Sequence, residues 1–227
     1  MHKRSSFIAL FCCVLLSAEA LAERTPARLG SGKDSLPSLV EFPELKGDTE
    51  ATIRCAAIVE ENGNLDMNGC FAEDPADQLF IEAIVEAAED ARARPAVADG
   101  DEKKVYLQYR VRFLKKGSEQ TVNVYPNPGV QENIDAYGQD HVAAQRVVGK
   151  EKWQDECPEN SRYLVWLKAH VAPDGQQSSL SLAHGGGLDP TPRCKQAILD
   201  TVAGSLFFPA LADGEPVPST YVEPFSN

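Results

Sequence analysis

A seven-residue stretch that occurs twice constrains the fold of this chain more than any other feature of its sequence. The first copy is RPAVADG (Arg94–Gly100) and the second is FPALADG (Phe208–Gly214). Each copy follows apolar residues at helical spacing and leads into a predicted strand, which ends at Phe113 in the first half and at Phe225 in the second. Because the same order of elements recurs, the repeat predicts two copies of one small unit.

The N-terminal residues predict an exported protein. Two basic residues precede an apolar run over residues 7–16, and Ala20 and Ala22 form a small-x-small cleavage pattern. This arrangement is typical of a secretory signal peptide over residues 1–22. The run is shorter than the roughly 20 apolar residues of a membrane crossing. We therefore expect cleavage before Glu23 and a periplasmic protein without a membrane span, with a retained anchor as the alternative.

The charge of the chain excludes one class of partner. The formal net charge is -12, and removing Lys3, Arg4 and Glu19 with the signal peptide changes it to -13. A chain this acidic lacks the basic surface that binds nucleic-acid phosphates. We predict no nucleic-acid partner, and we attribute the charge first to solubility.

The first predicted unit covers residues 47–113. Ile53, Cys55, Ala57 and Val59 alternate as in a half-buried strand, and the following Asn-Gly pair indicates a hairpin turn. A second strand, a helix with apolar residues at helical spacing and a third strand complete the unit. Residues 23–46, before this unit, are rich in glycine, proline and serine, and we expect a flexible leader there.

The second predicted unit covers residues 162–227 and has the same order of strand, turn, strand, helix and strand. Residues 114–161 join the two units without a clear period. A connection of this length without structure is unusual in a compact domain, so we expect part of it to pack against a unit. The predicted fold class is α+β, with two tandem units that each pack one helix on a small antiparallel sheet.

Both units resemble the C-terminal domain of TonB-type energy transducers. The residues that carry the resemblance are clearest in the second unit: Val171 and Gly175, then Leu188-Asp189, Phe207–Ala210, Gly214–Val217 and Phe225. In the first unit, Arg94 stands where the family usually has an aromatic residue. The resemblance covers somewhat over half of the chain.

The resemblance implies a function in protein binding. In that family, an exposed sheet edge captures an extended peptide from an outer-membrane receptor. This chain departs from the transducers because it has neither a transmembrane anchor beyond the signal peptide nor a long Pro/Lys spacer, so peptide capture is expected without energy coupling. The expected partner is an outer-membrane or other envelope protein.

The third strand of each unit is the candidate edge for this capture. Its candidate partner-binding residues are Tyr109, Val111 and Phe113 in the first unit and Val217, Tyr221 and Phe225 in the second. Trp166 is a further candidate because it falls on the strand face away from the predicted core. Its alternative role is packing against the connecting segment or the other unit. The rival function is a structural or assembly protein whose units pair with each other or with a second copy, and a homodimer is compatible with the sequence.

Four cysteines remain after signal-peptide removal, which suggests two disulfides in an exported chain. An Asn62-Gly63 two-residue turn would place Cys55 opposite Cys70, although in a register that separates their side chains. Pairing Cys157 with Cys194 would tie the entry of the second unit to its helix. Free thiols at a catalytic or metal site are the alternative, but the spacings fit no zinc pattern.

The sequence offers no catalytic constellation. His184-Gly185-Gly186-Gly187 is similar to the oxyanion-hole stretch of some esterases, but the chain has no Gly-x-Ser-x-Gly elbow for a nucleophile. We expect these residues in a loop between the second strand and the helix. Neither His141 nor His170 has a carboxylate or thiol at metal-ligand spacing. We therefore predict no enzyme, no metal and no cofactor.

Overall fold

The computed structural model describes residues 24–71, 74–157 and 162–226, so the predicted signal peptide lies outside the described residues. The elements of the first half are β1 (Arg24–Thr25), α1 (Leu36–Leu39), β2 (Thr49–Val59), β3 (Leu65–Phe71), a 3₁₀ turn (Pro75–Asp77), α2 (Gln78–Asp90), β4 (Ala96–Ala98), β5 (Asp101–Lys103), β6 (Val105–Lys116) and β7 (Glu119–Tyr125). The predicted α+β class is correct.

The remaining elements begin at residue 131. They are α3 (Gln131–Tyr137), β8 (Gln145–Val147), α4 (Lys152–Glu156), β9 (Tyr163–Val171), β10 (Gln177–Gly187), α5 (Pro192–Ala203), β11 (Phe207–Phe208), β12 (Ala210–Ala212), β13 (Glu215–Val217) and β14 (Ser219–Ser226). The His184–Gly187 stretch therefore belongs to β10, and our expectation of a loop there was wrong.

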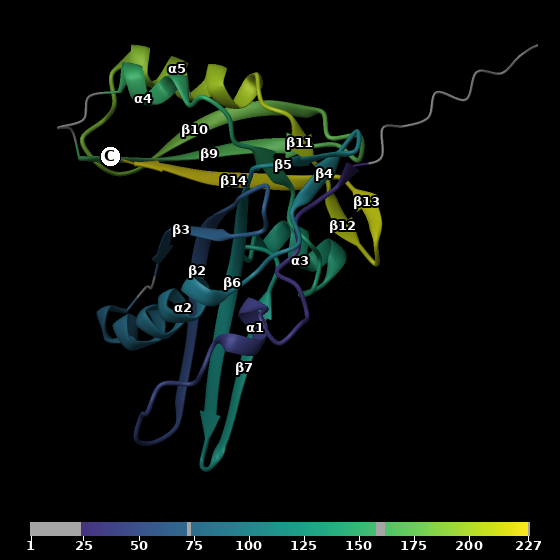
Figure 1. Cartoon of the computed structure of the whole chain (residues 1–227). Coiled ribbons are helices and arrows are strands. Elements are labelled where there is room, and N and C mark those ends of the chain that lie inside the picture. Colours follow the sequence, from purple (N-terminus) through teal and green to yellow (C-terminus); the bar gives the residue numbers. More distant parts are fainter. Residues whose placement is uncertain (1–23, 72–73, 158–161, 227) are drawn as a thin grey trace, which may run out of the picture.

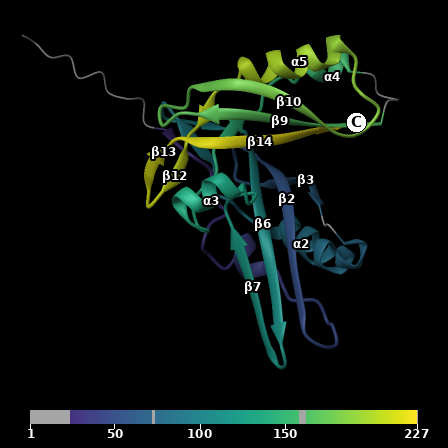
Figure 2. The same cartoon turned by 180° about the vertical axis from the view of Figure 1, so that it is seen from behind.

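Two main antiparallel sheets organise the molecule. The first has the order β11-β8-β6-β2-β3, with β7 also paired to β6, and the second has the order β10-β9-β14. Figure 1 shows the second sheet lying across the ends of the long strands β2 and β6, with α4 and α5 on its outer face, and the reverse view in Figure 2 agrees. Helix α2 packs beside β2 and β3. The β6–β7 hairpin extends away from the second sheet (Figure 1).

The two halves share their local geometry at the repeated stretches. In each, a short hairpin follows the helix, β4–β5 in the first half and β12–β13 in the second. The residues at the two tips, Asp99 and Asp213, both have positive φ and are followed by a glycine that does too, as a two-residue hairpin turn requires. Gly63 and Gly175 also correspond, since a Cβ on either would lie 2.4 Å from a backbone carbonyl oxygen.

The segment before β2 is packed, so our expectation of a flexible leader over residues 23–46 was wrong. Ala27 and Leu36 are completely buried, and the Gln145 side chain forms two hydrogen bonds of 2.8 Å with the backbone of Ala27. β1 pairs with β4, which makes this segment a third strand beside the first hairpin. Buried apolar residues at a few positions pack this segment against the rest of the first half. Their spacing shows no periodicity, so the sequence pattern did not reveal them.

The connecting segment over residues 114–161 is also structured. It supplies the end of β6 and all of β7, α3, β8 and α4. β7 forms an antiparallel hairpin with β6. β8 joins the halves, because it pairs with β6 of the first half and with β11 of the second. The segment thus packs against both halves rather than one.

The beginnings of the two halves also correspond. Thr25 pairs with Val97 and Arg28 bridges Arg94, while Val142 bridges Leu211 and Gln145 pairs with Phe208. In the repeat, Val97 corresponds to Leu211 and Arg94 to Phe208. Residues 25–29 and 142–146 therefore occupy equivalent places, and the short helices that follow, α1 and α4, contact α2 and α5 respectively.

Both predicted disulfides are present, Cys55–Cys70 and Cys157–Cys194. The turn between β2 and β3 is one residue longer than we predicted, because Glu60 is hydrogen-bonded to Asn64. A register shift between Ala56 and Ala57 then restores the alignment, so that Cys55 lies opposite Cys70. The pairing was right, whereas the two-residue turn used to derive it was wrong.

Candidate binding cleft

The predicted partner-binding residues of the first half are not accessible. Tyr109, Val111 and Phe113 are fully buried in β6. This strand is an interior strand: it pairs with β2 on one side, and on the other with β8 at Val105–Tyr106 and with β7 from Arg110 onward. The prediction that the third strand of the first half is an edge was wrong, because the connecting segment supplies β7.

The predicted edge of the second half is only partly open. The stretch over residues 217–225 consists of two strands, and Val217 ends β13 and is half-buried. Tyr221 and Phe225 on β14 are 2 % exposed and point into the core. They too are unsuited to contact a partner through their side chains.

The backbone edge of β14 is closed at its start. β14 pairs with β9, and the groups that point away from β9 belong to alternate residues. The Asn133 side chain binds both the N–H and the C=O of Thr220, and Gln108 donates to the C=O of Val222. Among the described residues, Pro224 and Ser226 are left with outward backbone groups that bond to no other strand.

Trp166 is exposed, as the strand alternation predicted, at 36 % of its surface. Its ring lies 6.5 Å from that of Phe71, which is itself 48 % exposed at the end of β3. Together they flank a small groove of about 180 Å³ between the two sheets. Trp166 therefore packs against the other half, which was the alternative role, while part of its indole remains accessible.

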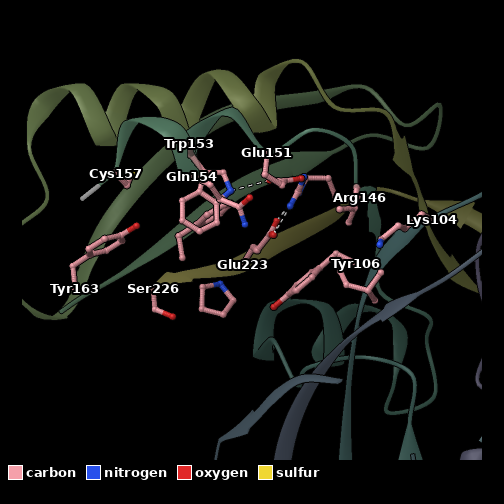
Figure 3. A pocket seen from close by; sticks show the side chains of 14 residues that line it. Lys104, Tyr106, Arg146, Glu151, Trp153, Gln154, Cys157, Tyr163, Glu223 and Ser226 are labelled. Carbon is pink, nitrogen blue, oxygen red and sulfur yellow. Dashed lines mark hydrogen bonds and ion pairs between the residues drawn. The ribbon is translucent and has the colours of Figure 1, made fainter. Parts of the chain in front are cut away.

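A larger cleft of about 740 Å³ lies between the end of β14, the start of β6 and the short helix α4 (Figure 3). Its lining combines aromatic and charged side chains from both halves of the chain. The lining residues are Ile58, Lys104, Tyr106, Arg146, Val148, Glu151, Trp153, Gln154, Cys157, Tyr163, Glu223, Pro224, Phe225 and Ser226. The open end of the β14 edge, Pro224–Ser226, thus forms part of the cleft wall.

A buried ionic cluster lies at the centre of the cleft. The Arg146 guanidinium donates to both oxygens of Glu223, at 2.8 and 2.6 Å, and to Glu151 at 2.9 Å. The side chains of Arg146 and Glu223 are only 3 % and 4 % exposed. Tyr221 donates to Glu223 and the Trp153 indole N–H donates to Glu151. Every carboxylate oxygen of the cluster therefore accepts at least one hydrogen bond.

Contacts within the cluster keep the Arg146 side chain charged and the Tyr221 hydroxyl protonated. Burial alone would lower the pKa of Arg146, but the Glu223 carboxylate raises it above its usual range through charge and hydrogen bonding. The pKa of Tyr221 is also raised, first by burial and then by the charge of Glu223. Arg146 therefore stays protonated and Tyr221 stays a hydrogen-bond donor at neutral pH.

Aromatic rings form the walls around this cluster. Trp153 meets Phe225 edge-to-face, with 5.4 Å between the ring centroids. The Tyr163 hydroxyl is buried and has no hydrogen-bond partner among the described residues. A buried hydroxyl without a partner costs free energy, and a ligand in the cleft could supply that partner.

The equivalent place in the first half is an apolar core. Arg146 corresponds to Leu29 and Glu223 to Val111, and both of these are buried apolar residues. There the ring of Phe42 packs on Phe113, at 5.7 Å between centroids. The buried Arg146–Glu223 pair therefore has no charged counterpart in the first half.

Our interpretation of the sequence missed both charged residues of this pair. A signal was present for Glu223, which occupies an inward position between Tyr221 and Phe225 where the pattern calls for an apolar residue. Arg146 lay in a segment without periodicity, and only its alignment with residues 25–29 would have revealed the change from leucine to arginine.

Other kinds of site are absent from the described residues. No group of three or more histidine, cysteine, aspartate or glutamate side chains is placed to hold a metal ion in residues 24–71, 74–157 and 162–226. No helix within these ranges combines the length and apolar character of a membrane crossing. His170 lies on the exposed face of β9, as the alternation predicted.

Compared with known proteins, the chain matches no protein-family model, no curated protein and no solved structure. The resemblance to TonB C-terminal domains therefore depends on the residues quoted above. What the geometry itself defines is a cleft that combines hydrogen-bonding groups and aromatic surfaces beside a short open strand edge.

Proposed function

We propose that this protein is an exported protein-binding module of two TonB-C-like units, which captures an extended segment of an envelope protein along the end of β14. The two disulfides support an oxidising compartment such as the periplasm. The repeated order of elements and the matching turn geometry support two related units. Energy transduction is not part of the proposal.

The observation that carries the proposal is the position of β7 on β6. In the repeat, Phe113 of β6 corresponds to Phe225 of β14. β7 pairs with residues 110–116 of β6 in antiparallel orientation, and its Val122 lies opposite Phe113. The equivalent stretch of β14 begins at Val222 and has no such strand in the described part of the chain. The first half therefore illustrates, within one molecule, how a strand adds to this edge.

The short open edge limits what the backbone can contribute. Pro224 has no N–H, so the edge offers chiefly the C=O of Pro224 and the backbone groups of Ser226. A net hydrogen bond contributes about 0.5–1.5 kcal/mol, so two or three of them give weak binding. Most of the affinity must therefore come from side chains that enter the cleft, whereas in other cases of strand addition the main-chain hydrogen bonds give affinity and side-chain pockets give specificity.

Site-specific photo-crosslinking tests the proposal. A photoreactive residue at position 226 should crosslink, in the native compartment, to one short extended segment of a partner protein. The same residue at position 178 is the matched control, because Ser178 is an exposed residue on the opposite edge strand, β10. Crosslinks from position 226 to a second copy of this chain would support the rival assembly function. Equal crosslinking from both positions would contradict capture at β14.

A further inference from the structure

We propose that the cleft takes a basic side chain, a lysine or arginine of the captured segment, which binds between Glu151 and the aromatic walls. This inference rests on the proposed function and names the chemistry of the partner. It depends on the charges of the cluster, the acceptor positions still open and the register of the added strand.

The charges in the cleft favour a cation. One guanidinium, Arg146, faces two carboxylates, Glu151 and Glu223, so the cluster carries a formal excess of one negative charge. Lys104 at the rim does not balance it, because it pairs with Glu60. An anion would therefore enter beside two carboxylates, whereas a cation would neutralise the excess. The acidic chain as a whole also attracts basic segments.

Glu151 has acceptor positions to spare. A carboxylate has about four lone-pair positions. Glu151 accepts from Arg146 and Trp153, one bond to each oxygen, so about half of its capacity is open. Its side chain is 12 % exposed, more than that of Glu223, so an incoming group reaches it first.

The walls of the cleft suit a basic side chain as well. The alkyl stem of lysine or arginine packs on aromatic rings, and its cationic head is attracted to their faces. Trp153 lies beside Glu151 in the wall of the cleft, and Tyr163 lines the cleft farther along, beside Cys157, as Figure 3 shows.

The register of β7 on β6 tells which residue of the segment reaches the cleft. Val124 of β7 lies opposite Val111, the counterpart of Glu223, and Asn123 lies opposite Arg112, the counterpart of Pro224. Residues directly opposite in an antiparallel pair share one face of the sheet. A lysine at the Val124 position would thus point into the cleft with Glu223, and one at the Asn123 position would point to the other face.

Peptides with the sequence of β7 provide the probe. The parent is residues 120–124 (QTVNV), with blocked ends and a fluorescent label, and its dissociation constant for the full oxidised chain is measured by anisotropy. The variants carry Val124→Lys, Val124→Glu or Asn123→Lys. We expect Val124→Lys to bind about tenfold more tightly than the parent, with an advantage that decreases at high salt.

The remaining peptides and one protein variant test whether the charge of the lysine causes the tighter binding. Val124→Glu should bind more weakly than the parent, and Asn123→Lys should gain much less than Val124→Lys. In the protein, Glu151→Gln should reduce the advantage of the lysine peptide. Glu89→Gln, which changes the net charge equally at an exposed position of α2, should not.

The outcomes separate the two proposals. If the parent peptide binds but Val124→Lys has no advantage over Asn123→Lys, the basic-residue inference is wrong and strand capture stands. If Val124→Glu binds best, the cleft prefers an anion and the inference is overturned. If no peptide of the series binds, capture at the end of β14 fails, and the inference fails with it.

Discussion

Replacing Arg146 and Glu223 together by their counterparts from the first half should cost less stability than replacing either residue alone. The counterparts are Leu29 and Val111, so the variants are Arg146→Leu, Glu223→Val and the double variant. Both charged side chains are at least 96 % buried. Breaking a buried ion pair by removing one partner costs about 3–5 kcal/mol, because the other charge is left uncompensated.

The two single variants should differ in detail. Glu223→Val leaves Arg146 with Glu151, so we expect a loss near the lower end, about 3 kcal/mol. Arg146→Leu leaves two carboxylates without a cation, and a loss of about 4 kcal/mol is expected. The double variant should lose about 2 kcal/mol: replacing a buried pair by apolar residues is often neutral, but Tyr221 loses its buried acceptor and Glu151 its cation. The coupling energy of the cycle is then about 5 kcal/mol.

Urea unfolding of the oxidised chain at neutral pH, followed by tryptophan fluorescence, measures the cycle. Equal m-values among the four proteins are required for the comparison. If the double variant loses as much stability as the two single variants together, the coupling energy is zero. That result would refute the interpretation of Arg146 and Glu223 as one buried pair that replaces an apolar contact.

Three further changes test other parts of the structure. Gly175→Ala should lower the free energy of unfolding by about 1–3 kcal/mol, because φ is 80° and the new Cβ would lie 2.4 Å from the carbonyl oxygen of Phe207; thermal unfolding measures this loss. Replacing Cys157 and Cys194 by alanine should cost about 4 kcal/mol, since the disulfide closes a loop of 37 residues; urea unfolding measures this cost. Burial lowers the pKa of His141 below its usual 6.5, so the unfolded chain binds a proton first and stability should fall as the pH drops below about 6.5; His141→Asn should flatten this dependence in urea titrations between pH 7 and 5.

Each of these changes has a matched control. Gly117→Ala lies in a turn with positive φ and open space around its Cβ, so it should cost less than Gly175→Ala. Replacing the Cys55–Cys70 disulfide, with a separation of 15 residues, should cost less than replacing the longer loop. A pH dependence that is identical with and without the histidine would contradict the assignment to His141.

Local patterns in the sequence were sufficient for the elements that repeat. Strand alternation predicted β2 and β9, and helical spacing predicted α2 and α5, whereas the short hairpins at the seven-residue stretches were not predicted. The hairpin also brings Cys55 close to Cys70, although a register shift between Ala56 and Ala57 was needed to compensate for the longer turn. These features depend on neighbours in the chain, so a sequence pattern records them.

Which strand edges are covered, and where the cleft lies, depended on segments that show no periodic sequence pattern. β7 covers the edge of β6, and the Asn133 and Gln108 side chains cover the start of the β14 edge. Five of the seven predicted contact residues also have side chains that are buried in the core. These contacts join residues far apart in the chain, such as Asn133 with Thr220. No periodic pattern in the local sequence indicates which segment will pair with a given strand edge.

The sequence alone therefore determined the repeated α+β elements, the two disulfides and the exposure of Trp166, because each follows from periodicity or from short-range geometry. The tertiary structure decided that the first edge is filled by the chain itself and that the second opens into a charged cleft. The physical reason is that a strand edge and a buried charge find their partners among residues that are close in space, not in sequence. Arg146 and Glu223 are 77 residues apart and meet only when the two main sheets are packed together.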